Sequence, residues 1–327
     1  ITQIMPGVTK DAVFRKGHII REEDIPVLLS VGKDSVYIWE NDETMMHEND
    51  AAEVLYRMTA NEHMHPSDAK EGKIEAIADT EGLLKVDREK LKKVNAFGEM
   101  MIATRHGNTV VKKGDKLAGT RIIPLVIKKD KMQEAEKICD GTPILKILPF
   151  TVKKAAIITT GNEVYHGRIK DAFTPVIEQK IAEFGAEMMF HEIFDDNDRK
   201  ITDGCLRAIE AGADIVFCTG GMRVDPDDKT PLAIKNTGAE MISYGSPVLP
   251  GAMFLLSYYR KGDKVIPICG LPGCAMYNRR TIFDLVLPRL MAADPVTADE
   301  LASLGEGGLC LNCKVCTFPN CGFGKGW

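Results

Sequence analysis

The chain has 327 residues, a formal net charge of −5 and 27% charged residues. This length predicts roughly two domains, with cores large enough to form without disulfides. The net negative charge disfavours a broad nucleic-acid interface, and no apolar run approaches the ~20 residues of a membrane-spanning helix. Five of the nine cysteines stand singly in apolar runs, as Cys205 and Cys218 do. Buried free thiols are typical of a reducing compartment, so we expect a cytoplasmic protein.

Residues 1–150 alternate short helix-like and strand-like segments without a regular repeat. We predict a helix over residues 22–30 and a strand over residues 36–39. An amphipathic helix follows over residues 49–60, where apolar side chains recur at helical spacing. Residues 113–127 predict a turn followed by a hydrophobic strand. The segment is therefore expected to be a mixed α+β region, and its sequence indicates no role.

From residue 151 the pattern becomes regular. We predict strands over residues 155–160, 188–194, 214–219 and 264–269, and helices over residues 174–187, 199–214 and 276–290. Strands that alternate with helices of this length form βαβ units and a parallel sheet. Near-continuous apolar strands also indicate a sheet that is covered on both faces. We therefore expect an α/β domain over residues 151–295.

Glycine-containing loops directly follow three of these strands. They read TTGNE at residues 159–163, TGGMRVDPDDKTP at residues 219–231 and CGLPG at residues 269–273. In an open parallel sheet, ligands bind outside the carboxyl ends of the strands, so the three loops are expected to meet at one edge. Glycine lets backbone N–H groups approach an anion closely. The loops therefore predict a small-molecule site.

The middle loop carries three carboxylates, Asp225, Asp227 and Asp228, within four residues of the chain. Mg²⁺ is commonly held by one or two carboxylates together with substrate phosphates. One carboxylate is equally explained as the cap of a helix that begins near Thr230. A helix cap does not account for all three carboxylates, so Mg²⁺ is a candidate ligand of this loop.

Residues 153–292 resemble a known family on the strength of these motifs. The residues that carry the resemblance are ITTGNEV, GRI, the pair Asp195-Asp196, CTGGMRVDPDDKTP, the turn Pro250-Gly251 and the LPG at residues 271–273. The family is the molybdopterin-binding domain shared by molybdopterin adenylyltransferases, molybdenum insertases and competence-damage-inducible proteins. The resemblance implies a doubly wound, three-layer α/β fold with a mostly parallel sheet, commonly as a homo-oligomer.

The resemblance also implies molybdopterin as the ligand. By spacing, Asp228 matches the family's acidic residue for pterin binding and transfer chemistry, and Asp227 stands beside it, so these two are the catalytic candidates. The implied cofactor-binding residues lie in the glycine loops and the Pro-Gly turn: Thr160, Gly161, Asn162, Glu163, Thr219, Gly220, Gly221, Thr230, Pro250, Gly251, Leu271, Pro272 and Gly273.

Three functions follow from the resemblance. The first is a role in biosynthesis of the molybdenum cofactor, in molybdate insertion or in carriage of the cofactor. The activity would be that of a molybdopterin adenylyltransferase or a molybdenum insertase, and a molybdoenzyme would be a partner. The second is a non-catalytic regulator or carrier. It is favoured by Asp225, where insertases commonly have glycine, and by LPGCA, where the family usually has LPGNP. The third is a nucleotide pyrophosphatase, which ranks lowest because the chain has no Walker motif.

Four cysteines, Cys310, Cys313, Cys316 and Cys321, lie close together near the end of the chain. Thiolates this close repel one another unless a metal binds them, and a metal can replace a core in a short segment. Their spacing is near the bacterial ferredoxin run, whereas structural zinc sites use two separated Cys-x-x-Cys pairs. Residues 296–327 are therefore predicted to be a glycine-rich hinge and a metal-binding tail. The alternatives are an iron–sulfur cluster, which we expect first, Zn²⁺, and metal-free thiols.

Overall fold

The computed structural model describes residues 2–5, 9–12, 14, 18, 20–36, 42–222 and 228–326. It divides the chain into two compact units, residues 1–45 and residues 46–327. The strand predicted over residues 36–39 falls largely outside the described residues. Among the residues that are described, no helix is long and apolar enough to cross a membrane.

The first unit contains a small hairpin and a short helical segment. Strand β1 (Thr2–Met5) pairs antiparallel with β2 (Thr9–Ala12). Helix η1 (Glu22–Asp24) continues into α1 (Ile25–Ser30), which together cover the range predicted as a helix. The carboxylate of Asp24 accepts a hydrogen bond from the backbone N–H of Arg21 and so ties the start of this segment together.

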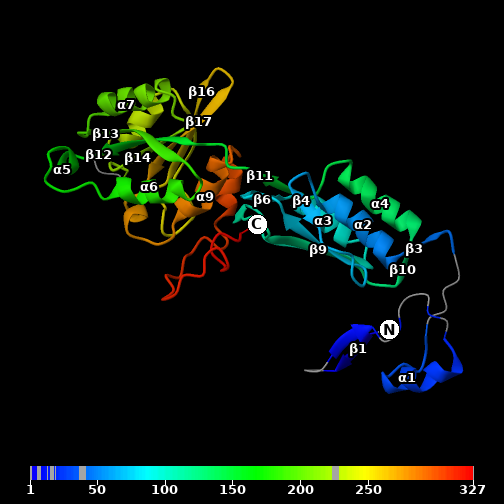
Figure 1. Cartoon of the computed structure of the whole chain (residues 1–327). Helices are drawn as coiled ribbons and strands as arrows, with labels where there is room; N and C mark the ends of the chain where they lie inside the picture. The colour runs from blue at the N-terminus through cyan, green and yellow to red at the C-terminus, as the bar shows by residue number, and fades with distance from the viewer. Residues whose placement is uncertain are drawn as a thin grey trace. The chain divides into compact units, whose positions relative to one another are not determined.

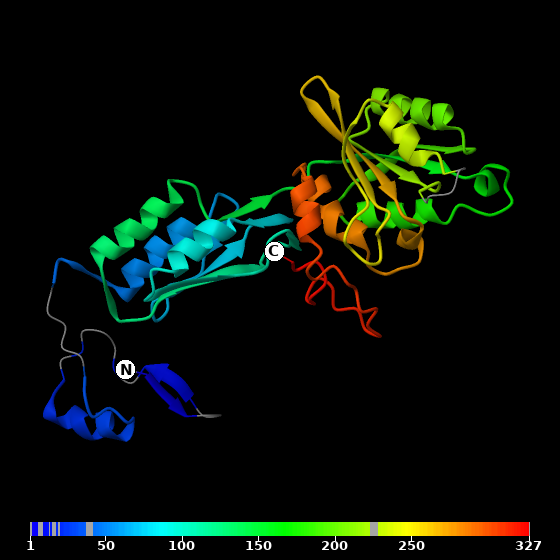
Figure 2. The same ribbon diagram turned by 180° about the vertical axis from the view of Figure 1, so that it is seen from behind.

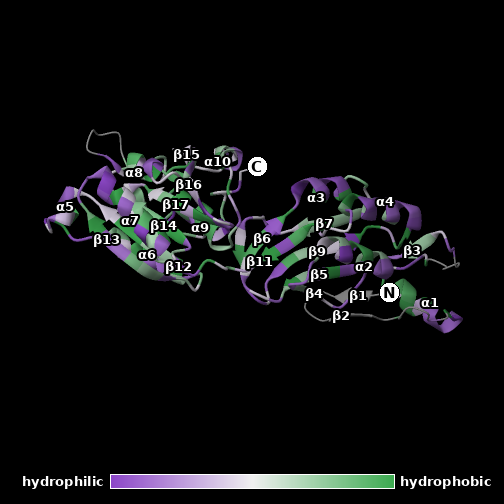
Figure 3. Ribbon diagram, turned by 90° about the horizontal axis from the view of Figure 1, so that it is seen from above, coloured by the Kyte–Doolittle hydropathy of each residue, from purple (hydrophilic) through white to green (hydrophobic). Residues whose placement is uncertain are grey.

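Residues 46–150 form a mixed α+β region, as predicted. One antiparallel sheet has the order β4-β5-β9-β7, and a second has the order β11-β6-β8. Short strand β3 leads into α2, which packs on β5 and β9, and Figure 3 shows α3 and α4 as largely hydrophilic. The elements are β3 (Met45–His47), α2 (Glu48–Thr59), β4 (Met64–Pro66), β5 (Lys73–Ala78), β6 (Gly82–Val86), α3 (Arg88–Asn95), β7 (Met100–Thr104), β8 (Thr109–Val111), β9 (Lys116–Ile122), β10 (Val126–Lys128), α4 (Lys129–Cys139) and β11 (Leu145–Leu148).

The regular part of the chain forms one six-stranded sheet with the order β13-β12-β14-β17-β16-β15. The first four strands are parallel, which confirms the predicted mostly parallel sheet, and β16 and β15 add an antiparallel edge. The β16–β17 hairpin projects beyond the other strands (Figure 2). The strands are β12 (Lys154–Thr160), β13 (Glu187–Phe194), β14 (Ile215–Thr219), β15 (Glu240–Tyr244), β16 (Leu255–Lys261) and β17 (Lys264–Leu271).

Helices cover both faces of this sheet, so the domain has the predicted three layers (Figure 1). One core contains Ile177 and Phe283, from α6 (Phe173–Ala182) and α9 (Ile282–Met291). The other contains Ile201 and Ile234, from α7 (Asp198–Glu210) and α8 (Thr230–Asn236). Helix α9 begins at Ile282, later than predicted, because Thr281 and Asp284 form a capping box there.

The strand order fixes where the loops meet. The chain leaves β12 for β13 on one side of the sheet and then returns to β14 on the other side. Such a reversal opens a crevice at the carboxyl ends of the two central strands. In the sheet register, Thr159 lies beside Thr219, and Thr219 lies beside Leu271. The three glycine loops therefore start at one edge, as predicted.

The end of the chain packs back on the domain. After α10 (Ala298–Ser303), Leu309 pairs with Leu249, and Phe323 is buried in the core that contains α9. A Cβ added to Gly308 would lie 2.5 Å from the carbonyl oxygen of Leu304, and one added to Gly307 would lie 2.9 Å from that of Gly322. The glycines that we expected to form a hinge thus allow close backbone packing in this structure.

Candidate functional site

A threonine cradle joins the ends of β12 and β14 to the start of α8. The Thr160 hydroxyl donates a hydrogen bond to the carbonyl oxygen of Thr219 at 3.0 Å. The Oγ1 atoms of Thr160 and Thr230 are also 3.0 Å apart. All three threonines are buried. Because Thr160 ends a strand and Thr230 begins a helix, these contacts fix the middle loop against the first.

Two glycines let the middle loop lie directly on Thr160. Gly220 and Gly221 have φ angles of 81° and 54°. Residues other than glycine rarely adopt positive φ angles of this kind. A Cβ on Gly220 would lie 2.1 Å from the Thr160 carbonyl oxygen, and one on Gly221 would lie 2.7 Å from the Oγ1 atom of Thr230. We call residues 160, 219–221 and 230 the glycine edge. Only glycine fits its two central positions.

The glycine edge contains a buried polar atom that has no partner among the residues that the structure describes. The Oγ1 atom of Thr219 is buried and makes no hydrogen bond to the described residues. Leaving such a group unsatisfied costs about 1–3 kcal/mol. Unsatisfied buried groups in native structures often mark functional sites or missing water and ions. The hydroxyl of Thr219 is therefore available to a water molecule or a ligand at this edge.

The TTGNE loop forms a wall beside the glycine edge. The N–H of Gly161 donates to the carbonyl oxygen of Phe194 at 3.1 Å, at the end of β13. The N–H of Asn162 donates to the carboxylate of Asp196 at 3.1 Å. Asn162 and Glu163 then begin the short helix α5 (Asn162–Tyr165). Asp196, which follows β13, thus holds this loop in place.

Asp228 lies near enough to Tyr244, at the end of β15, for its charge to act on the tyrosine hydroxyl. The Tyr244 hydroxyl donates to the carbonyl oxygen of Met222 at 3.0 Å. Burial, followed by the nearby negative charge of Asp228, raises the pKa of Tyr244 above its ordinary value. The predicted residues Asp225 and Asp227 lie outside the described residues. Tyr244 had no signal in the sequence, because it stands in an ordinary strand.

The remaining predicted residues divide into two groups. Leu271 lies beside Thr219 in the sheet, and Pro272 and Gly273 follow it, with open space where a Cβ of Gly273 would stand. The turn Pro250-Gly251 instead packs on the start of α9, since a Cβ on Gly251 would lie 2.4 Å from the Ile282 side chain. Leu271 therefore lies beside the glycine edge, whereas Pro250 and Gly251 lie against α9.

Comparison with known families identifies this domain. Residues 156–292 match a family described as "Probable molybdopterin binding domain". These residues belong to that family. The match covers β12 to α9 and therefore includes every strand of the six-stranded sheet and the whole glycine edge. The predicted resemblance is confirmed for this part of the chain. Residues 1–40 match a domain of unknown function.

Individual relatives match only parts of the chain. A protein of Bacillus cereus (strain B4264) named as competence-damage inducible is 30% identical over 129 residues, which are 39% of this chain and 30% of that protein. The corresponding protein of Bacillus subtilis (strain 168) is 32% identical over 85 residues, which are 26% of this chain and 20% of that protein. The chain thus spans less than a third of the length of these relatives.

Two solved structures are also similar to part of the chain. The tungsten cofactor synthesizing protein MoaB from Pyrococcus furiosus has 18% identity and a TM-score of 0.37, over 44% of this chain and 98% of that chain. The protein CinA from Thermoplasma acidophilum, of unknown function, has 17% identity and a TM-score of 0.34, over 42% of this chain and 98% of that chain.

The molybdopterin-binding domain holds a second polar cluster that sequence reasoning missed. The carboxylate of Asp171 accepts hydrogen bonds from the hydroxyls of Thr174 at 2.6 Å and Thr159 at 2.9 Å. The Nε2 atom of His191 lies 3.5 Å from the same carboxylate oxygen. Burial alone would raise the pKa of Asp171, but hydrogen bonds from Thr174, Thr159 and the N–H of Phe173 hold it below its usual value. The register of β12 with β13 brings His191 to this cluster, and the sequence does not give that register.

The four tail cysteines line one cavity of about 560 Å³, together with Arg280 and Phe318 among others. Cys310 and Cys321 are partly buried, whereas Cys313 and Cys316 are exposed. Across the described parts of the chain, no three His, Cys, Asp or Glu side chains come close enough to hold a metal ion. The structure therefore brings the thiols to one cavity without assembling the predicted ligand set. The backbone of Cys310 is held by its hydrogen bond to Leu249.

Proposed function

We propose that the chain binds molybdopterin or the molybdenum cofactor at the glycine edge and acts in cofactor biosynthesis, molybdate insertion or carriage. The observation that carries this proposal is the contact of Gly220 and Gly221 with Thr160 and Thr230, within a domain of the molybdopterin-binding family. We further propose a cytoplasmic homo-oligomer that meets a molybdoenzyme as its partner.

The residues at the edge suit a phosphate-bearing pterin. Backbone N–H groups of a glycine loop make a concave anion site, which would receive the phosphate at Gly220 and Gly221. The hydroxyl of Thr219, which has no hydrogen-bond partner in the described part of the chain, offers a further hydrogen bond. Asn162 and Glu163 would contact the ligand from the opposite wall.

Asp228 is the proposed catalytic carboxylate, with Asp227 beside it in sequence. The influence of its negative charge on Tyr244, at the end of β15, supports this role. A carboxylate there would hold Mg²⁺ or orient molybdate, and a bound cation would stabilise charge that develops on a transferred group.

A non-catalytic carrier or regulator is the second candidate. The LPGCA turn places Ala275 in a buried position, and burial raises the pKa of the neighbouring Cys274 thiol, which keeps it neutral. A neutral thiol and an alanine offer little to transfer chemistry in this turn. Nucleotide pyrophosphatase activity is the third candidate, and it is supported only by the partial similarity to proteins named as competence-damage inducible.

One set of assays separates the three candidates. Calorimetry should detect micromolar or tighter binding of molybdopterin or of adenylylated molybdopterin. A turnover assay with Mg²⁺ and ATP, repeated with Asp228→Ala, then tests catalysis. Loss of turnover with retained binding supports a transferase, and binding without turnover in either protein supports a carrier. Pyrophosphate hydrolysis without pterin binding would reject both in favour of the third candidate.

We also propose that the tail cysteines bind a metal, either as an iron–sulfur cluster or as Zn²⁺. Support comes from the cavity that all four thiols line. Because Cys313 and Cys316 are exposed, their loop is the part that would close on a metal. Protein purified without oxygen should contain iron with acid-labile sulfide, or one zinc per chain. Metal-free protein, or a metal retained after Cys313 and Cys316 are both replaced by Ser, would contradict the proposal.

A further inference from the structure

A large cavity lies where the strand pair β6–β8 meets α9 and the end of the chain. Its volume is about 810 Å³, within the range of roughly 300–1,000 Å³ that is typical of small-molecule sites. None of the described residues that we assign to pterin binding lines it. Its floor is apolar and contains Phe184, Leu285, Val286, Val296, Phe318 and Phe323.

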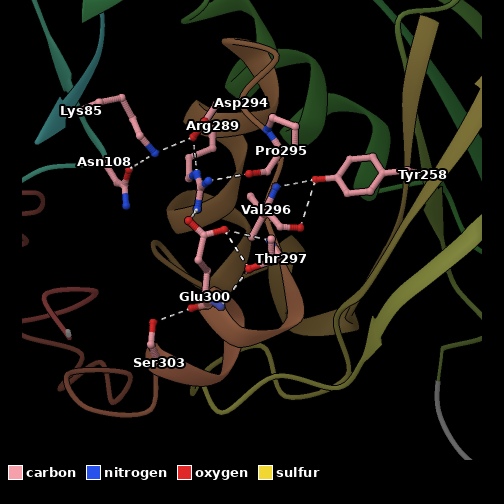
Figure 4. Close-up of polar contacts among 10 residues, drawn as sticks. All are labelled: Lys85, Asn108, Tyr258, Arg289, Asp294, Pro295, Val296, Thr297, Glu300 and Ser303. Carbon is pink, nitrogen blue, oxygen red and sulfur yellow. Dashed lines mark hydrogen bonds and ion pairs between the residues drawn. The ribbon is translucent and has the colours of Figure 1, made fainter. Parts of the chain in front are cut away.

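Ion pairs hold the walls of this cavity together. The Nζ atom of Lys85 lies 2.8 Å from the carboxylate of Asp294, which also accepts a hydrogen bond from the Nε atom of Arg289 (Figure 4). Only 6% of Arg289 is exposed. On the opposite side, a guanidinium nitrogen of Arg88 donates to the carbonyl oxygen of Gly326 at 3.4 Å. The cavity is thus bounded by contacts between segments far apart in the sequence.

The inward-facing carboxylates of the cavity already have partners. Asp284 is bound by Lys180 and by Arg280, and the Arg280 contact is 2.8 Å long. Glu300 lies 2.8 Å from a guanidinium nitrogen of Arg289 (Figure 4). The other acidic residues in the lining are exposed, where water and salt screen their charge: Glu81, Asp87, Glu89 and Glu183.

Positive charge gathers at one end of the cavity. Lys325 is partly buried, and its ammonium group has no hydrogen-bond or ion-pair partner within the described parts of the chain. His106 faces the same space and hydrogen-bonds through Nδ1 to the carbonyl oxygen of Gly107 at 2.9 Å. Burial, and then the charges of Lys325 and Arg88, lower the pKa of His106, although hydrogen bonds between its ring and the backbone of Gly107 and of Lys325 oppose them. Cations that repel one another in a half-buried space favour binding of an anion.

We propose that this cavity binds a monophosphate ester with an aromatic body. Lys325, His106 and Arg88 hold the phosphate through charge-assisted hydrogen bonds. The aromatic body packs on the floor, where Phe184, Phe318 and Phe323 offer ring faces and edges. The cavity is a second small-molecule site, independent of the glycine edge.

The test uses the full chain and adenosine monophosphate as the probe, with adenosine and inorganic phosphate as its two halves. Calorimetry should show that adenosine monophosphate binds at least about ten-fold tighter than adenosine or inorganic phosphate alone. Adenosine contacts only the apolar floor of the cavity, and inorganic phosphate contacts only its cationic end. Lys325→Met and His106→Gln should each weaken binding about ten-fold or more. Lys128→Met, which removes an exposed lysine outside the cavity, should change nothing.

A second readout keeps the site distinct from the glycine edge. In an NMR titration, the pKa of His106 should rise when the monophosphate binds, because the phosphate stabilises the protonated ring. Gly221→Val, which blocks the glycine edge, should leave this rise unchanged. No binding at millimolar monophosphate, equal affinity for inorganic phosphate, or unaltered affinity in folded Lys325→Met would each overturn the proposal. Loss of binding in a folded Gly221→Val protein would also overturn it, because the probe would then occupy the glycine edge.

Discussion

Gly220 lies so close to Thr160 that a Cβ on residue 220 would stand 2.1 Å from the Thr160 carbonyl oxygen. This contact joins the loops that follow β12 and β14, the two strands between which the chain reverses its direction along the sheet. It leaves the N–H groups of the middle loop at the carboxyl edge, where α/β domains bind their ligands. The following predictions test the contact, its hydrogen bonds and its surroundings.

Gly220→Ala should destabilise the domain by about 2–4 kcal/mol, because the new methyl group meets backbone and the φ angle of 81° strains it. Urea unfolding measures the loss. Gly119→Ala is the matched control, since its Cβ would have ordinary contacts at 3.6 Å. Equal stability of the two variants would show that Gly220 does not press on Thr160.

Thr160→Val keeps the shape of the side chain and removes its hydroxyl. The Thr219 carbonyl oxygen and the Thr230 hydroxyl then lose their partner, so the free energy of unfolding should fall by about 1–3 kcal/mol. Thr104→Val, in strand β7, is the control because no hydrogen bond of its hydroxyl is seen in the described part of the chain. A smaller loss for Thr160→Val than for Thr104→Val would argue against the threonine cradle.

The Asp171 cluster should make stability depend on pH. Because the pKa of Asp171 is lower in the folded state than its ordinary value of 3.8, its contribution is present above that value and is lost as pH falls towards the folded pKa. Asp171→Asn should therefore have a lower free energy of unfolding than the wild type at pH 7. It should also lose less of that free energy as the pH falls from about 5 to about 3. Urea unfolding across this range measures both. Asp263→Asn, an exposed turn variant, should follow the wild type, and an unchanged acid drop in Asp171→Asn would contradict the assignment.

Arg289→Met should destabilise the region between α9 and α10 strongly, because it removes the buried cation that binds both Asp294 and Glu300 and leaves Lys85 as the remaining cation beside Asp294 (Figure 4). Breaking a buried ion pair from one side typically costs about 3–5 kcal/mol. Arg260→Met, whose guanidinium lies 3.7 Å from Glu240 at the surface, should cost less than about 1 kcal/mol. Thermal unfolding compares the two, and similar losses would show that the Arg289 pairs are not the stabilising feature.

Much of the parallel sheet could be predicted because its strands are short apolar runs with helices between them, as in residues 155–160 and 214–219. The antiparallel edge of the sheet could not be predicted, because the polar end of β16, SYYRK, does not indicate which strand β16 pairs with. Pairing register is a long-range property, and it also brings His191 to Asp171.

The tail shows the limit of motif spacing. The cysteine pattern predicted one compact ligand set, but the pairing of Leu309 with Leu249 holds one end of the segment while Phe323 anchors the other in the core. Neither contact has a signal in the cysteine spacing. The glycine edge was predicted more fully, because strand-end glycines and the family motifs indicate the same residues.

Binding of molybdopterin to the full chain, measured by calorimetry for the wild type and for Gly221→Val, tests the central claim most directly. A valine at position 221 would place its Cβ 2.7 Å from the Oγ1 atom of Thr230 and close the glycine edge. We predict micromolar or tighter binding by the wild type and at least a hundredfold weaker binding by Gly221→Val, a difference of about 2.7 kcal/mol, with Gly119→Ala unchanged. Equal binding by wild type and a folded Gly221→Val protein, or no binding by the wild type, would contradict the account.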